Sequence, residues 1–401
     1  MKTKNFFVDS LLNIISSALP LLILQIVSFP ILAKELGGDK YGTIVALISL
    51  FTIVSFPLGN VLNNLRLLMN KTYIERNLRG DFNFILIVVS FLSIPFITIS
   101  TIYVNPITNY LNLFFLIIIT ILAIWKEYLI VSFRIRLNYK GILLNNMYMC
   151  LGYIAGTVIF SFVGYWQAIY ILGLLFSLIY IFNSSTLHRE PYTKTSLLGE
   201  TKKKYIQLYS ASLLKNVVVH ADKLLLLALV GPVAVTIYYT STIIGKVISM
   251  MINPINSVML SYLVKTEKID IKSFMKVLTL SILVGIVGYF IAIFISPYFL
   301  MHFYTEWASE AIKLIYITTA IAVVDVLSTV LNPYNLRFNK TVWQIYMSVA
   351  HLILYVTCSY YLFILYDLIG FALGILLAAI LKLIIQLSVF LINYSKSCKL
   401  I

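Results

Sequence analysis

Long apolar runs separated by short polar breaks fill almost the whole of this sequence, and they constrain its fold more than any other feature. A helix of about 20 apolar residues is long enough to cross the hydrocarbon core of a membrane. Reading each run against the breaks beside it predicts twelve membrane-spanning helices. Their expected ranges are 10–33, 41–64, 83–103, 111–133, 142–163, 167–186, 207–230, 233–263, 274–296, 311–332, 342–365 and 368–392.

The composition supports this interpretation. Hydrophobic residues make up 61% of the chain and charged residues 11%, whereas about a quarter of the residues of a soluble globular domain are charged. The net charge of +15 raises the question of nucleic acid. The cations do not form a basic domain or a basic stripe mixed with aromatic residues, so nucleic acid is excluded as a partner. The sequence predicts an all-α, polytopic membrane protein.

The distribution of lysine and arginine predicts the orientation of the chain. The segments on one side hold 21 of these residues, whereas those on the other side hold only Lys34 and Lys40. The richer side comprises both termini and the loops 65–82, 134–141, 187–206, 264–273 and 333–341. Because cytoplasmic loops carry the excess of positive charge, we expect both termini to be cytoplasmic.

The longest loop on the cytoplasmic side, residues 187–206, falls between the sixth and seventh spans. It contains Pro, Gly and three consecutive lysines, which is typical of a linker. We therefore expect an N-terminal lobe of six helices over 1–186 and a C-terminal lobe over 207–401 that ends in a short cytoplasmic tail. A faint repeat of spans one and two in spans seven and eight favours two equivalent lobes.

The run 207–230 carries polar residues in its interior: Lys215, Asn216, His220, Asp222 and Lys223. Ionisable groups within a membrane are costly unless they face protein or water, so they mark a transport pathway by default. We expect Lys215, Asn216, His220 and Lys223 to line a cavity and contact the substrate. Asp222 is a candidate for ion coupling. The alternative is a structural ion pair between neighbouring helices.

Further polar residues lie inside other spans. Lys246 and Asn253, seven residues apart on one helical face, are predicted substrate contacts. Asp325 is a second candidate for ion coupling, because a carboxyl group inside the membrane can take up or release a proton. Two alternatives stay open: Lys246 pairs with another helix, or Asp325 pairs with Lys246 or Lys382.

Arg66 and Lys126 lie near the cytoplasmic ends of their spans and are candidate contacts on the side where a substrate enters. For both residues a structural role is the alternative, as a topology residue for Arg66 and as a snorkelling side chain for Lys126. The spacing Gly152-x-x-x-Gly156 is the small-residue pattern of close helix packing. No P-loop, acidic metal pair, nucleophile elbow or HExxH motif is present, so we expect no metal, no cofactor and no enzymatic activity.

Two stretches, LAKELGGDKYG at 32–42 and HADKLLLLALVGPVAVTIYYT at 220–240, resemble the Wzx-type flippases of O-antigen and capsular polysaccharide repeat units. These flippases belong to the MOP exporter superfamily, which also includes the MATE multidrug antiporters. The family pattern has Asp-Arg, then Leu-Gly, then Gly-Tyr. This chain has Asp222-Lys223, Val230-Gly231 and a Tyr238 without a preceding Gly.

The resemblance implies two six-helix lobes around a central cavity in a bacterial inner membrane. The implied substrate is an undecaprenyl-pyrophosphate-linked oligosaccharide, flipped to the periplasmic leaflet for O-antigen (lipopolysaccharide) or capsule assembly. A polymerase and a chain-length regulator are the implied partners beside membrane lipid. Two alternatives stay open, an ion-coupled multidrug antiporter of the same fold and a membrane enzyme of glycan synthesis such as a repeat-unit polymerase.

Overall fold

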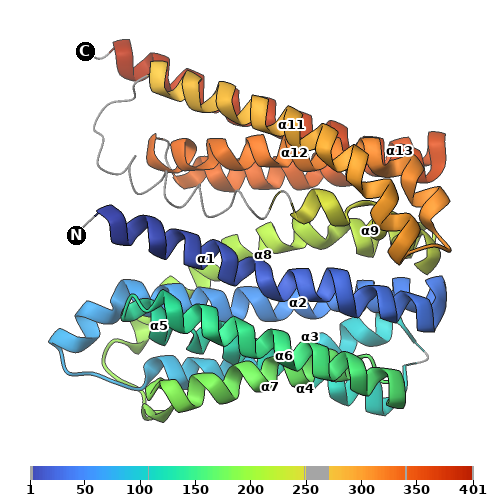
Figure 1. Ribbon diagram of the computed structural model, residues 1–401. Helices are drawn as coiled ribbons and strands as arrows, with labels where there is room; N and C mark the ends of the chain where they lie inside the picture. Colours follow the sequence, from blue (N-terminus) through green and yellow to red (C-terminus); the bar gives the residue numbers. More distant parts are fainter. Residues whose placement is uncertain (1–2, 107, 248, 250–270, 339–340, 400–401) are drawn as a thin grey trace. The chain divides into compact units, whose positions relative to one another are not determined.

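The computed structural model describes residues 3–106, 108–247, 249, 271–338 and 341–399, and most of them are helical (Figure 1). The described residues contain no strand. The prediction of an all-α protein is therefore confirmed.

The helices follow one another in the order of the apolar runs. Up to the middle of the chain they are α1 Thr3–Ile23, the π-helix η1 Leu24–Ser28, α2 Phe29–Glu75, α3 Asp81–Val104, α4 Tyr110–Leu129, α5 Val131–Ile135, α6 Tyr139–Val163, α7 Gln167–Ser184, the short 3-10 helix η2 Leu187–Arg189 and α8 Leu198–Leu229. The described helices after these are α9 Pro232–Ser241, α11 Ile271–Phe303, α12 Ala308–Phe338 and α13 Thr341–Lys399.

Two of these helices contain a sharp break between two predicted spans. Gly37 in α2 has φ +75° and ψ 166°, and Asp367 in α13 has φ +49° and ψ −137°. A positive φ is easy for glycine and tolerated by aspartate, so both positions suit a tight reversal of the chain. These breaks separate the first span from the second and the eleventh from the twelfth.

Eight helical stretches of the described chain are long and apolar enough to cross a membrane. Because two of them each hold two predicted spans, they account for ten of the twelve. Helix α8 contains the seventh span, and the described part of the eighth comprises α9 and the helical residues 243–247. The prediction of a polytopic helical membrane protein is confirmed.

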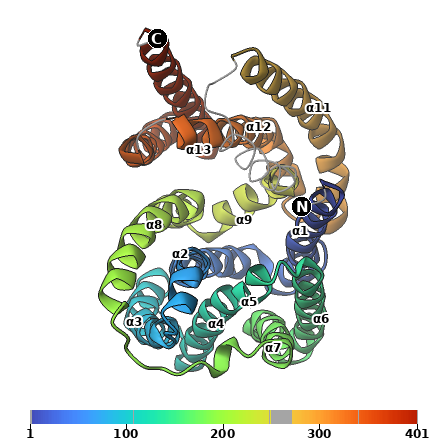
Figure 2. The same cartoon turned by 90° about the vertical axis from the view of Figure 1, so that its left-hand side faces the viewer.

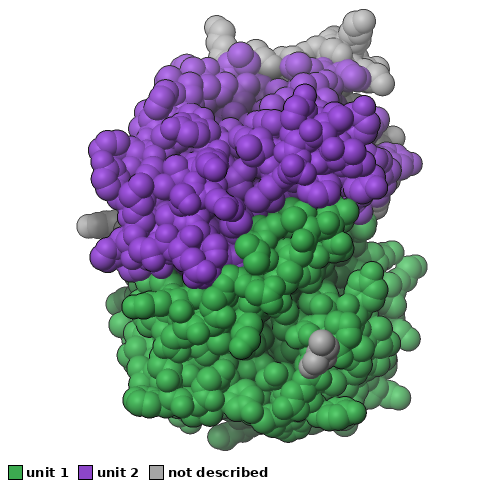
Figure 3. Space-filling view, turned by 90° about the vertical axis from the view of Figure 1, so that its right-hand side faces the viewer, with its two compact units in different colours: residues 1–235 green, residues 236–401 purple. Residues whose placement is uncertain are grey.

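The contacts divide the chain into two compact units, residues 1–235 and 236–401 (Figure 3). In the first unit α4 packs against α2, α3 and α7, while α6 packs against α7 and α1 (Figure 2). Its core is built from fully buried side chains of five segments, among them Leu62, Phe82, Tyr128, Leu129 and Ile181. In the second unit α12 packs against both α11 and α13.

The segment between the sixth and seventh spans is docked on the first unit. Asn83 donates its Nδ2 to the carbonyl oxygens of Leu187 at 3.2 Å and Glu190 at 2.9 Å. Further along, the buried Tyr205 of α8 donates to the carbonyl oxygen of Leu58 in α2 at 3.0 Å. The contacts thus group 187–235 with the first unit, and a lobe boundary within 187–206 stays a prediction.

Candidate functional site

The polar residues predicted to line a cavity lie on α8 in two different surroundings. Asp222 and Lys223 are buried, and the Lys223 Nζ lies 2.5 Å from the Asp222 Oδ1. The same Nζ donates to the carbonyl oxygen of Val219 at 3.2 Å. The carboxylate is therefore neutralised by its neighbour in sequence.

The other predicted residues of α8 are more open. Lys215 is exposed, whereas Asn216 and His220 are half-buried. Asn216 donates its Nδ2 to the carbonyl oxygen of Ser212 at 2.9 Å. The substrate-contact roles of Lys215, Asn216, His220 and Lys223 stay predictions.

Lys246 has an aromatic neighbour in the second unit. Its Nζ lies 4.0 Å from the ring centroid of Tyr239, within the range of a cation–π interaction. Asn253, the other contact predicted for this span, lies outside the described residues.

Asp325 pairs with Lys382 across the α12–α13 contact, with 3.5 Å between the Oδ1 and the Nζ. This is one of the ion pairs that the sequence left open. One turn further along the same seam, Ser328 donates to the Gln386 Oε1 at 2.8 Å. The Asp325 side chain keeps 47% of its surface exposed. Its role in ion coupling stays a prediction.

Lys126 pairs with the adjacent Glu127 at 2.9 Å, and its side chain is only 12% exposed. The backbone carbonyl of Glu127 accepts a hydrogen bond from the Nδ2 of Asn63 at 2.8 Å. The Asn63 bond ties α4 to α2, whereas the ion pair of Lys126 lies within α4. The role of Lys126 as a substrate contact stays a prediction.

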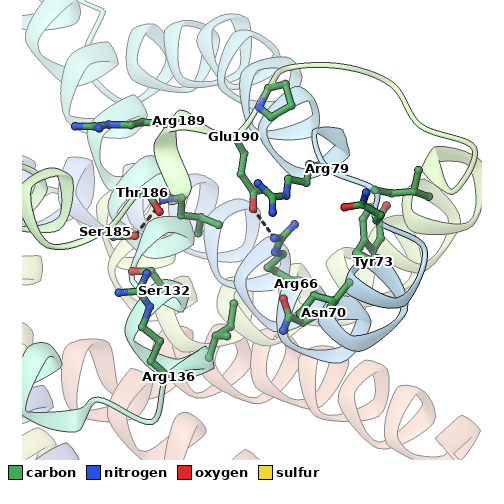
Figure 4. Close-up of a pocket in the computed structure, with 16 residues that line it drawn as sticks. Arg66, Asn70, Tyr73, Arg79, Ser132, Arg136, Ser185, Thr186, Arg189 and Glu190 are labelled. Atoms are coloured by element: carbon green, nitrogen blue, oxygen red, sulfur yellow. Dashed lines mark hydrogen bonds and ion pairs between the residues drawn. The ribbon is translucent and has the colours of Figure 1, made fainter.

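Arg66 lines a pocket of about 470 Å³ that lies entirely within the first unit (Figure 4). Four arginines and one glutamate are the charged groups of its wall, which gives it a net charge of +3. They are Arg66, Arg79, Arg136, Arg189 and Glu190. We call this site the four-arginine pocket.

Arg66 is the buried cation of the four-arginine pocket. Its Nη2 donates to the Glu190 Oε1 at 2.7 Å, and its guanidinium carbon lies 4.8 Å from the ring centroid of Phe82 and 6.0 Å from that of Tyr73. The Nε and Nη1 of Arg66 are also buried, and they make no hydrogen bond to any residue that the structure describes. A buried donor without a partner carries a desolvation cost, so these atoms call for an acceptor.

The other three arginines are exposed and come from loops far apart in the sequence. Arg79 lies between α2 and α3, Arg136 directly follows α5, and Arg189 ends η2. In Figure 4 the Arg79 side chain points toward Glu190 and Arg66, whereas Arg189 points away from them. All these loops belong to the side that the positive-inside rule makes cytoplasmic.

A second set of buried polar contacts, centred on Asp81 at the start of α3, holds the pocket loops in place. The fully buried Asp81 carboxylate accepts hydrogen bonds from the Thr195 amide at 2.7 Å, from the Thr195 hydroxyl, and from the Tyr73 hydroxyl at 2.7 Å. The preceding Gly80 has φ +124°, and a Cβ there would lie 2.5 Å from the Thr193 Oγ1. Only glycine lets the chain approach the 187–206 segment this closely.

Of the ten predicted site residues, Arg66 is the one at the four-arginine pocket. Arg79, Arg136 and Arg189 were expected only as cations of the positive-inside loops, because no motif distinguishes them from the other Lys and Arg residues there. Their convergence depends on how the helices pack. Among the described residues no group of His, Cys, Asp or Glu side chains could hold a metal ion.

No protein-family model matches the sequence, and no curated protein does either. Several solved structures match almost the full chain. An outward-facing multidrug resistance MATE transporter of the MOP superfamily gives a TM-score of 0.65 at 12% identity, covering 97% of this chain and 95% of that one. An inward-facing one gives 0.61 at 13% identity, covering 96% of each chain.

A MOP superfamily transporter from Pyrococcus furiosus gives a TM-score of 0.60 at 13% identity, covering 96% of this chain and 95% of that one. It is described as having a binding pocket whose reverse polarity suggests a different function. Identities this low show a common fold and nothing about substrate. The chain has the twelve-helix fold of the MATE transporters of the MOP superfamily.

Proposed function

We propose that this protein transports its substrate across the membrane by alternating access and is a flippase of lipid-linked oligosaccharides. It would carry an undecaprenyl-pyrophosphate-linked repeat unit from the cytoplasmic to the periplasmic leaflet of a bacterial inner membrane. The fold supports the transport mechanism, because the similar MATE transporters are known in inward-facing and outward-facing forms. A polymerase with its chain-length regulator would use the flipped product in O-antigen or capsule assembly.

The excess of positively charged side chains is the observation that supports an anionic substrate. The four-arginine pocket has one carboxylate against four guanidinium groups, on the side where the lipid-linked precursor is made. In the predicted seventh and eighth spans the cations Lys215, Lys223 and Lys246 outnumber the acid Asp222. A diphosphate is drawn to such cations, whereas a cationic drug is repelled.

A multidrug antiporter is the alternative that the comparisons favour, since two of the similar structures carry that description. For the Pyrococcus furiosus transporter, the reverse polarity of its binding pocket is described as suggesting a different function, and we apply the same criterion to this chain. Uptake of fluorescent cations into proteoliposomes separates the two functions. Transport of the cations without transport of lipid-linked glycan would favour the antiporter.

The decisive experiment is genetic. Deletion of the gene should leave lipid-linked repeat units on the cytoplasmic leaflet, inaccessible to a glycan-oxidising reagent added from the periplasmic side. Re-expression should restore their accessibility. If the repeat units reach the periplasmic leaflet in the deletion strain but stay unpolymerised, the protein is a polymerase and the proposal fails.

Asp325→Asn should reduce export by about tenfold or more and abolish its dependence on external pH, because the amide cannot take up the coupling proton. The measurement is the initial rate of export across a range of pH values. Asp367→Asn is a matched control, since it makes the same chemical change at an exposed acid of the turn in α13. An unchanged pH profile in Asp325→Asn would leave Asp222 as the remaining candidate for coupling.

A further inference from the structure

Arg66 brings two buried donors without an acceptor among the described residues to the wall of the four-arginine pocket. A guanidinium presents five N–H donors in a rigid plane that matches phosphate oxygens. Among the described residues only the Nη2 of Arg66 has an acceptor, whereas its buried Nε and Nη1 have none there. Arg66 is 94% buried, so donors left without an acceptor carry a desolvation cost.

We infer that the four-arginine pocket binds a phosphate or diphosphate group at the cytoplasmic face, with Arg66 as its central contact. Its volume of about 470 Å³ lies in the range of small-molecule sites. Arg79 and Arg136 add charge at the exposed rim, and the buried Ser132 hydroxyl in the wall also lacks a partner among the described residues. Charge-assisted hydrogen bonds from a planar guanidinium are the strongest contacts a protein offers to phosphate.

Glu190 acts as an internal competitor for the anion. Its Oε1 accepts from Arg66, and its Oε2 is buried without a hydrogen-bond partner in the described part of the chain. Asn83 fixes the backbone carbonyl of Glu190, so the side chain can move while the loop stays in place. An anion that binds Arg66 must displace this carboxylate or lie beside it. Either event costs binding energy, which removal of the Glu190 charge would recover.

A phosphate group of this kind has two sources. The first source is the head group of a diphosphate-linked lipid, and the pocket would then be the place where the proposed flippase first binds its substrate. The second source is a soluble diphosphate of the cytoplasm. The first source rests on the proposed function, whereas phosphate binding by the pocket does not.

The test measures binding of inorganic pyrophosphate to the full-length protein in detergent at low ionic strength, by isothermal titration calorimetry. Glu190→Gln should bind pyrophosphate about fivefold more tightly than the wild type, because it removes the competing charge. Arg79→Ala and Arg136→Ala should each weaken binding by about threefold, as exposed charges do. Arg76→Ala is the matched control, because it removes an exposed arginine of the same loop that does not line the pocket.

Removing Arg66 alone would leave Glu190 buried without a counter-ion and endanger folding. The double variant Arg66→Met with Glu190→Met replaces the whole pair by apolar side chains, which keeps the buried charge balanced. It should fold and lose pyrophosphate binding altogether. A melting temperature close to that of the wild type shows that the loss is specific.

A second arm places the protein in phosphatidylcholine nanodiscs with a few per cent of a polyprenyl diphosphate. Thermal stabilisation by this lipid that Glu190→Gln enhances assigns the site to the lipid head. Pyrophosphate binding without any effect of the lipid keeps the site but removes it from the flippase pathway. The inference is overturned if wild type and variants do not differ in pyrophosphate binding, or if neither ligand binds at millimolar concentration.

Discussion

Asp81→Ala should lower the free energy of unfolding of the first unit by about 3 kcal/mol or more. The change removes the acceptor of three hydrogen bonds in a fully buried place, and each donor left unsatisfied costs about 1–3 kcal/mol. Tyr73 can still bond to the Thr201 hydroxyl, 2.7 Å away, so the loss falls mainly on Thr195. Thermal unfolding of the full-length protein in detergent should show a melting temperature lower by roughly 6–12 °C.

Loss of the Asp81 hydrogen bonds should also change the four-arginine pocket. Thr195 anchors the segment that carries Glu190 and Arg189, so releasing it loosens the wall opposite Arg66. Asp39→Ala is the control, because Asp39 is an exposed acid in the turn between the first two spans. Equal melting temperatures for the two variants would show that the Asp81 contacts do not hold the segment 187–206 in place.

The positions of the spans could be predicted from the sequence because their signal is local. Each apolar run predicts a span without reference to the rest of the chain. The two chain reversals lie at Gly37 and Asp367, in the polar breaks between runs. The seventh span was predicted at 207–230, whereas α8 begins at Leu198, within the predicted linker 187–206. The pairing of its charges was not foreseen, because Lys215 and Asp222 share a helical face, yet Asp222 pairs with Lys223 beside it.

The four-arginine pocket could be predicted only at Arg66. Arg79, Arg136 and Arg189 carry no motif, and a rule about membrane topology already explains each of them. Only the packing of α2 against α4 and the docking of the 187–206 segment bring these loops together. The contacts of Asp81 could not be predicted from the sequence either. An acid in the first turn of α3 is expected at a helix N-terminus. Its hydrogen bonds to Thr195, 114 residues away, depend on the tertiary structure.

The double variant Gly152→Ala with Gly156→Ala should destabilise the first unit by about 3 kcal/mol or more, through overpacking of the α6–α7 contact. A Cβ on Gly152 would lie 2.4 Å from the carbonyl oxygen of Leu172, and a Cβ on Gly156 would lie 2.5 Å from the Cα of Ile169. These are backbone atoms of α7, so no side-chain movement can relieve the overlap and the helices must separate. The small-residue spacing read from the sequence is therefore the close contact of this pair of helices.

Gly199→Ala is the matched control, because it adds the same methyl group in the first turn of α8, where no atom lies within 4 Å. It should leave the melting temperature unchanged or raise it slightly, since alanine restricts the unfolded chain. Separation of α6 from α7 should also abolish transport, because alternating access needs each lobe to move as a rigid body. If the double variant melts and transports like Gly199→Ala, α6 and α7 are not in close contact through Gly152 and Gly156.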